Sequence, residues 1–141
     1  MKLYKLTDES GLTCNKTQWG DGVLHQAKGD PNQELCTDGF IHAYTHPLLA
    51  VLFNHIHTNF PSPLLWEAAG EVGLSDGLKV GCKALTTLRC IPLPVITTAQ
   101  RVRFAILCAL EVCPDPAFVQ WANGWLDGTD RTQAAAWAAA W

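Results

Sequence analysis

The chain has 141 residues, 48% of them hydrophobic, which is typical of a single domain that can bury a core. Lys and Arg number 10 against 13 Asp and Glu, so the net charge is -3 and there is no excess of basic residues for nucleic acid or an anionic membrane to bind. The first residues lack a signal-peptide pattern, and no window offers eighteen uncharged apolar residues. We therefore predict a cytoplasmic protein with no nucleic-acid and no membrane partner.

Residues 1–96 are predicted to form an α+β body. The expected fold is a small twisted antiparallel or mixed sheet with one packed helix, because short alternating stretches are separated by Gly, Asp, Asn and Pro clusters. Pro47 suits the first turn of a helix over 47–57, which stops before Pro61. The predicted strands cover 2–6, 23–27, 39–44, 65–72 and 86–93.

Residues 97–128 are predicted to form a helical hairpin packed on the body. Apolar residues recur at helical spacing in two segments joined by a short Pro-containing link, which favours two antiparallel neighbours. The first helix is expected over 98–113 with Thr97 or Thr98 as its cap, and the second from Asp115 and Pro116 to just before Gly128.

Residues 129–141 are predicted to form an Ala/Trp-rich helical tail. Asp130 and Gln133 have the spacing of a capping box, and Trp137 and Trp141 lie four residues apart on one helix face. Two interpretations stay open for this pair. The indoles pack on the body, or they form an exposed ridge for self-association or for a partner groove.

Four of the five histidines lie within residues 39–57: His42, His46, His55 and His57. Pro47 divides this stretch into a strand and a helix, so the imidazoles are expected to point in different directions and to fill separate structural roles. No metal site and no cofactor are therefore predicted. A zinc site built in the tertiary structure from Cys36, His42 and His55 is the alternative. The six cysteines form no C-x-x-C pair, and we expect them to be reduced.

The predicted strand "GFIHAY" carries the strongest candidate for a ligand site. Phe40, His42 and Tyr44 point to one side of a strand, whereas Ile41 and Ala43 point to the other. Since the purely apolar side suits the core better, the side with His42 is expected to line a cleft, although a structural histidine with a satisfied hydrogen bond is the alternative.

Acidic partners for His42 are few. Glu67 and Glu71 share one face of a regular strand, and a glutamate beside the imidazole could polarise a ligand hydroxyl. A solvated strand carboxylate is the alternative. The predicted ligand-binding set is His42, Tyr44, Phe40, Tyr4 and Glu71, with no residue assigned a catalytic role.

Two stretches carry a resemblance to known families. "ELCTDGFIHAYTHPLLAVLF" followed by "LLWEAAGEVGLSDGLKVGCKALTTLR" resembles a family of uncharacterised domains found in bacteriophages and bacterial genomes. The segment from "QRVRFAILCALEV" to the C-terminal Ala/Trp repeat is similar to the helical portion of candidate immunity proteins. Neither resemblance implies an established activity.

The order of elements also resembles ADP-ribosyltransferase-like folds, which cleave NAD between two small sheets. That resemblance implies a polar residue on the first strand, where this chain has Tyr4 and Lys5. It implies a second position at His42 or Tyr44 and a later glutamate, for which Glu71 is the candidate. Fold likeness by itself does not establish function.

The sequence therefore favours a non-enzymatic binding or interaction protein of a phage or mobile element. It would sequester a small nucleotide-like ligand or contact a host protein, because no set of residues at catalytic spacing is visible. The alternatives are an ADP-ribosyltransferase-like enzyme acting on NAD or a related nucleotide, and a structural or assembly component that associates through Trp137 and Trp141.

Overall fold

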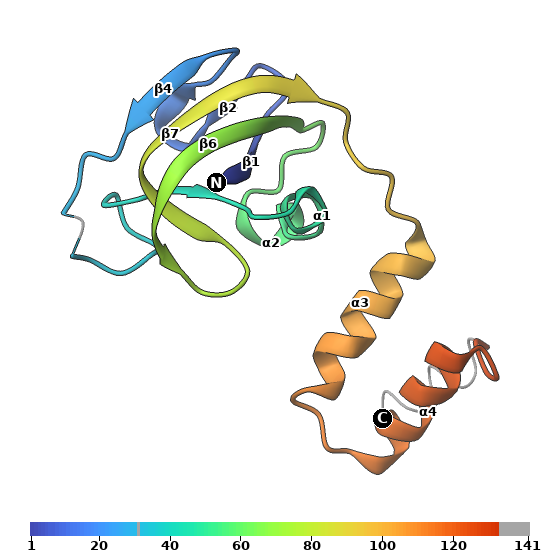
Figure 1. Ribbon diagram of the computed structural model, residues 1–141. Coiled ribbons are helices and arrows are strands. Elements are labelled where there is room, and N and C mark those ends of the chain that lie inside the picture. The colour runs from blue at the N-terminus through green and yellow to red at the C-terminus, as the bar shows by residue number, and fades with distance from the viewer. Residues whose placement is uncertain (31, 133–141) are drawn as a thin grey trace. The chain divides into compact units, whose positions relative to one another are not determined.

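The computed structural model describes residues 1–30 and 32–132, and it divides the chain into two compact units, Met1–Val95 and Ile96–Trp141. Helices and antiparallel strands occur together, so the predicted α+β class is confirmed (Figure 1). Each unit is described by itself below. No helix within the described residues is long and apolar enough to cross a membrane.

A long hairpin of β6 (Leu64–Ser75) and β7 (Val80–Ile91) forms the centre of the first unit. Its turn is fixed by Asp76, whose carboxylate accepts the backbone N–H groups of Leu78 and Lys79 at 2.9 and 2.8 Å. The predicted strands 65–72 and 86–93 were wrong at the ends next to the turn, because β6 continues to Ser75 and β7 already begins at Val80. The small residues at the start of β7 interrupt the hydrophobic alternation, yet their backbone pairs with β6 and β5.

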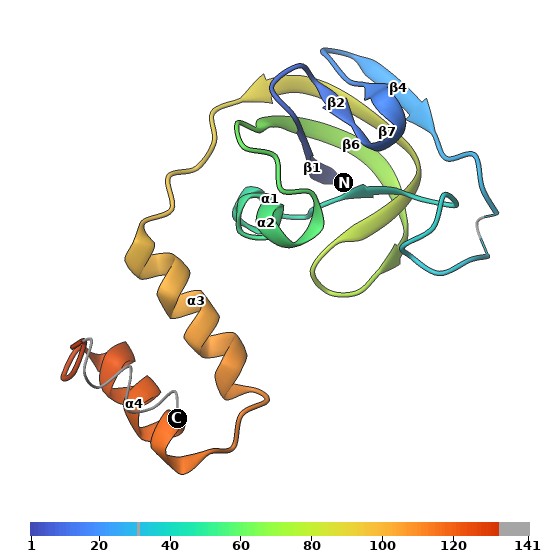
Figure 2. The same ribbon diagram turned by 180° about the vertical axis from the view of Figure 1, so that it is seen from behind.

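The remaining strands close the sheet into a ring (Figure 2). β1 (Lys2–Thr7) pairs with β6, while β4 (Val23–Gln26) and β5 (Ile41–Ala43) pair with successive parts of β7, all antiparallel. The backbones of Tyr4 and Tyr44 then exchange two hydrogen bonds of 2.8 Å, which join β1 to the residue after β5. Register shifts in the β6–β7 pairing interrupt the ladder, and such irregularities bend strands.

The predicted strand over 39–44 is shortened to Ile41–Ala43. Its first residues belong to a turn, in which Phe40 N–H donates to the Thr37 carbonyl at 3.5 Å, and Tyr44 pairs only through the isolated bridge to Tyr4. Ala43 belongs to the core and Ile41 packs against it, so the apolar side of this strand faces inward as expected.

The core of the first unit lies inside this ring. It includes Trp19, which the sequence did not place in any element. A small hairpin of β2 (Leu12–Thr13) and β3 (Thr17–Gln18), linked by the single turn η1 (Cys14–Lys16), precedes Trp19, and the indole N–H donates to the Thr13 hydroxyl at 2.9 Å. Two-residue strands leave no periodic pattern, so this hairpin could not be predicted. The buried core cluster consists of Leu3, Trp19, Ala43, Ala68, Val80, Cys82 and Leu85.

The helix expected over 47–57 is two short helices, α1 (Pro47–Leu52) and α2 (Asn54–His57). Pro47 does occupy the first turn, with the His46 imidazole accepting the Leu48 N–H at 3.2 Å. Phe53 interrupts the helix with φ -87° and ψ 1°. The apolar spacing that predicted one helix continues across this residue, and for that reason the pattern did not reveal the break.

The second unit contains α3 (Thr98–Leu110) and α4 (Pro116–Asp127), which run in opposite directions in both views (Figures 1 and 2). Thr97 forms a full capping box with Gln100, and Asp115 caps α4 by accepting the Phe118 N–H at 2.9 Å. α4 ends at Gly128, whose φ of +85° suits glycine.

The first of these helices is shorter than the predicted 98–113. It ends at Leu110, and the chain leaves it through a turn in which Cys113 N–H donates to the Ala109 carbonyl at 2.8 Å. The helix expected after Asp130, together with Gln133, Trp137 and Trp141, lies outside the described residues.

Candidate functional site

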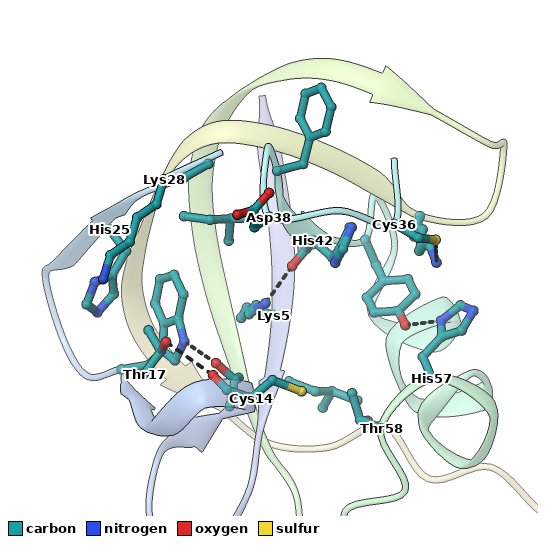
Figure 3. A pocket seen from close by; sticks show the side chains of 18 of the residues that line it. Lys5, Cys14, Thr17, His25, Lys28, Cys36, Asp38, His42, His57 and Thr58 are labelled. Atoms are coloured by element: carbon teal, nitrogen blue, oxygen red, sulfur yellow. Dashed lines mark hydrogen bonds between the residues drawn. The ribbon is translucent and has the colours of Figure 1, made fainter. Parts of the chain in front are cut away.

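A cavity of about 730 Å³ opens in the first unit (Figure 3). Its walls come from β1, the β2–η1–β3 hairpin, β4, the loop that follows β4, β5 and the end of α2. A cavity of this size falls within the range of small-molecule sites in proteins. Elements that are distant in the sequence thus converge on one space.

Lys5 lies in the middle of this cavity (Figure 3). It shares one face of β1 with Leu3 and Thr7, both fully buried, so its side chain points to the core side of the strand. Its ammonium donates to the His42 carbonyl at 2.7 Å and lies 5.3 Å from the centre of the Trp19 ring. No carboxylate within the described residues forms an ion pair with it. Burial therefore lowers the pKa of Lys5 from 10.5 to about 8.

His42 projects from β5 and is held by a backbone partner. Its Nε2–H donates to the Leu35 carbonyl, which fixes the orientation of the ring. Because a neutral imidazole protonated at Nε2 has its lone pair at Nδ1, this nitrogen is the ring's acceptor. Burial, as the largest influence, lowers the pKa of His42, so the ring is neutral at pH 7.

Tyr44 and His57 form a second polar pair on the cavity wall. The Tyr44 hydroxyl and His57 Nδ1 are joined by a hydrogen bond of 2.6 Å, and Phe53 stacks on the same imidazole at 5.2 Å between ring centres. Burial raises the pKa of Tyr44 to about 12 and lowers the pKa of His57. Both groups are therefore neutral at pH 7.

The charges around the cavity are strongly one-sided. Four of the chain's 10 basic residues line it, against one of its 13 acidic residues, Asp38. Lys79 also donates from its ammonium to the Cys36 sulfur at 3.1 Å. An excess of positive side chains in a concave surface raises the local concentration of anions. The four lysines are Lys5, Lys16, Lys28 and Lys79.

The predicted ligand-binding residues separate into two groups. Phe40, His42 and Tyr44 line the cavity, whereas Tyr4 and Glu71 are not among its lining residues. Tyr4 alternates with Lys5 along β1 and therefore points to the other face, and Glu71 is exposed on β6 beside a register shift.

Glu67 forms ion pairs with two cations on the neighbouring strands, Arg89 at 2.8 Å and Lys2 at 2.6 Å. The hydrogen bond from Arg89, followed by that from Lys2, lowers the pKa of this carboxyl to about 2. Glu67 does not line the cavity, which agrees with a structural carboxylate on the strand.

The alternative zinc site has no support in the arrangement of its proposed ligands. Cys36 and His42 line the cavity, but His55 is not among the lining residues and its Nδ1 lies 3.2 Å from the Asn59 side chain. Within residues 1–30 and 32–132, no group of three or more His, Cys, Asp or Glu side chains could hold a metal ion.

Comparison with family models, curated proteins and solved structures finds no match for this chain. The chemistry of the cavity is accordingly inferred from its own residues.

The predicted ligand-binding set did not include Lys5, His57 or Lys79, which line the cavity. A signal for Lys5 was present, because alternation along "KLYKLT" puts this lysine on the same face as Leu3, and a charged residue on a core face is unusual. His57 gave no comparable signal. Its contact with Tyr44 depends on the break at Phe53, which the apolar spacing does not show.

Proposed function

We propose that the first unit binds a small anionic, nucleotide-like ligand in the cavity around Lys5 and holds it without turnover. Such sequestration is the role favoured by the sequence for a binding protein of a phage or mobile element. The observation that carries the proposal is the charge of the lining, with four lysines and one carboxylate in a chain whose net charge is -3.

The lysines would engage the anionic part of the ligand. Lys16 and Lys28 are exposed and Lys79 is half-buried, so their ammonium groups remain hydrated until a ligand arrives. Hydrogen bonds between a charged donor and a phosphate oxygen are about twice as strong as neutral ones. A phosphate group is the simplest anion that uses several ammonium groups at once.

The aromatic lining would receive a planar ring. Trp19, Phe40 and Tyr44 line the same cavity as the lysines, each through the small part of its ring that is left exposed. Flat apolar surfaces next to a few polar groups are typical of pockets for cofactor-sized molecules. The combination of a planar ring and a phosphate describes a nucleotide-like ligand.

Calorimetric titration with a nucleoside and its mono-, di- and triphosphates tests this function. We expect affinity to rise with the number of phosphates and to fall as salt is added, because screening weakens attraction between exposed charges. Lys79→Met should weaken binding by roughly tenfold to a hundredfold, the cost of one charge-assisted hydrogen bond.

Lys83→Met is the matched control. Lys83 is exposed on β7 and does not line the cavity, so the same loss of charge should leave affinity unchanged. If both substitutions weakened the affinity equally, the effect would come from the net charge of the protein and not from a contact in the cavity. If no phosphorylated ligand bound at all, the proposal would be refuted.

An NAD-cleaving transferase is the alternative that the order of elements suggests. Two of its candidate residues, His42 and Tyr44, line the cavity, whereas Glu71 does not. Incubation with NAD followed by detection of free nicotinamide tests this function, and the signal should disappear in His42→Ala. Release at the uncatalysed rate would eliminate the enzyme and leave the binding protein.

The third class, an assembly component, depends on Trp137 and Trp141, which lie outside the described residues. It predicts an oligomer whose mass, measured by light scattering, falls when both residues are replaced by alanine.

A further inference from the structure

We propose that Lys5 captures its ligand covalently, by forming a reversible imine with a planar phosphorylated aldehyde or ketone. This inference rests on the proposed function, because it requires the anionic ligand to enter the same cavity. It goes further in naming the reacting atom of the protein, Lys5 Nζ, and the functional group that the ligand must carry.

The position of Lys5 is the first argument. An ammonium has three N–H donors, and within the described residues Lys5 has one acceptor, the His42 carbonyl at 2.7 Å. The side chain lies on the core side of β1 with no carboxylate paired to it, and it lines the cavity. A lysine that serves only as a surface charge would be placed in water, where no desolvation opposes it.

The protonation state of Lys5 supports the same chemistry. Only a neutral amine has the lone pair that attacks a carbonyl carbon, and burial lowers the pKa of Lys5 to about 8. An appreciable share of the protein therefore carries the neutral amine near pH 7. For an ordinary exposed lysine that share is smaller by more than a hundredfold, about two and a half orders of magnitude.

The reaction is a condensation that needs no oxidant or reductant. The Lys5 nitrogen attacks the carbonyl carbon, the new C–N bond forms, and the carbonyl oxygen takes up a proton as the nitrogen loses one, giving a carbinolamine. The hydroxyl then accepts a proton and leaves as water, while the nitrogen loses its remaining proton and forms the C=N bond. The products are one imine and one water, and hydrolysis reverses the reaction.

Neighbouring groups suit both the proton movements and the charge of the product. The Tyr44–His57 pair lines the same cavity and can deliver or accept a proton. A protonated imine carries its positive charge where the ammonium was, within reach of the Trp19 ring that lies 5.3 Å from Lys5 Nζ. Lys16, Lys28 and Lys79 are left to hold the phosphate.

Pyridoxal 5′-phosphate is a suitable probe because it is planar, phosphorylated and an aldehyde. The full chain is incubated with a limiting amount of the probe, reduced with borohydride, digested and analysed by mass spectrometry. We expect Lys5 to be labelled at least tenfold more than the exposed Lys83 of the same molecule. Labelling should increase as the pH is raised towards 8, where half of the Lys5 amine is neutral.

Lys5→Arg provides the matched variant. It keeps a positive charge at the position but cannot form this imine, so it should lose the dominant label. Pyridoxine 5′-phosphate, which has an alcohol in place of the aldehyde, should compete for the site without becoming attached.

The two proposals can fail separately. If nucleoside phosphates bind but Lys5 is labelled no more than Lys83, the imine is refuted and the anion site stands. Unchanged total labelling in Lys5→Arg would also refute the imine. If neither nucleoside phosphates nor the probe binds, both proposals fall together.

Discussion

Lys5 illustrates, at the scale of single residues, how a binding group can oppose folding. Its ammonium is removed from water and receives one hydrogen bond and one aromatic contact in exchange. The lowered pKa means that the folded chain disfavours the charged form. The unfolded chain has no such preference, so this side chain reduces the free energy of unfolding wherever the amine is protonated.

We expect Lys5→Met to stabilise the protein by about 1–2 kcal/mol at pH 7, because the gain from removing a desolvated charge exceeds the lost hydrogen bond. The gain should shrink between pH 8 and 10.5, since over that range the folded wild type has released a proton that the unfolded chain still binds. Urea unfolding of both proteins across this pH range measures the difference. A variant that is less stable at pH 7, or a difference that does not change with pH, would contradict the account.

The residue scale also shows what alternation in a strand can and cannot predict. Phe40, His42 and Tyr44 were identified because two aromatics and an imidazole share one side of a strand. The same rule gives no information on whether a strand face meets a cavity or a packed core, and therefore Tyr4 was chosen in place of Lys5. Only the three-dimensional closure of the sheet distinguishes these two faces.

At the scale of elements, the turn after α2 decides where His57 lies. Asn54 is buried at the start of α2, and its side-chain oxygen accepts from Thr58 Oγ1 and Phe60 N–H at 2.8 and 3.1 Å. Its amide nitrogen donates to the Phe60 carbonyl at 2.8 Å. The Asn54 side chain thus holds the residues that follow His57, and this segment places the His57 imidazole next to Tyr44.

We predict that Asn54→Leu lowers the free energy of unfolding by about 2–3 kcal/mol, because it leaves the partly buried backbone N–H and carbonyl of Phe60 without partners. It should also separate His57 from Tyr44, which NMR titration of the imidazole would detect as a pKa closer to the ordinary value of 6.5. Asn123→Leu, at an exposed position of α4, is the control and should change stability by no more than about 0.5 kcal/mol. Equal effects of the two substitutions would contradict this role for Asn54.

Element boundaries were predictable where a local signal fixes them. Thr97 marked the start of α3, and Asp115 and Gly128 marked the two ends of α4, because caps depend on nearby backbone groups. The register shifts in β6 depend on pairing with β7, which no local pattern reports. The break at Phe53 lies inside continuous apolar spacing, which does not show it either. The same limit explains why β7 was predicted to begin six residues too late, at 86 rather than at Val80.

For the whole molecule, the core cluster of the first unit draws only on residues between Leu3 and Leu85. The ring of strands and the cavity lining also fall within Met1–Val95. A unit that contains its own core and its own hydrogen-bonded sheet has what independent folding requires.

We therefore expect a chain that ends at Val95 to fold and to bind phosphorylated ligands with the affinity of the full chain. Dispersed amide signals in an NMR spectrum and calorimetric titration would establish both properties, with Lys79→Met in the shortened chain as the control for binding at the same site. Collapsed amide dispersion would show that the first unit needs the rest of the chain.

The sheet closes through a single residue pair, Tyr4 with Tyr44, whereas β6 and β7 are bonded along almost their whole length. Separating that pair breaks two hydrogen bonds, which costs roughly 1–3 kcal/mol. Every other strand pair in the ring has more residue pairs, so separating it costs more free energy. Lys5 follows Tyr4 directly, and His42 lies two residues before Tyr44. If the cavity widens to take a larger ligand, we expect the ring to open at this bridge, next to Lys5 and close to His42.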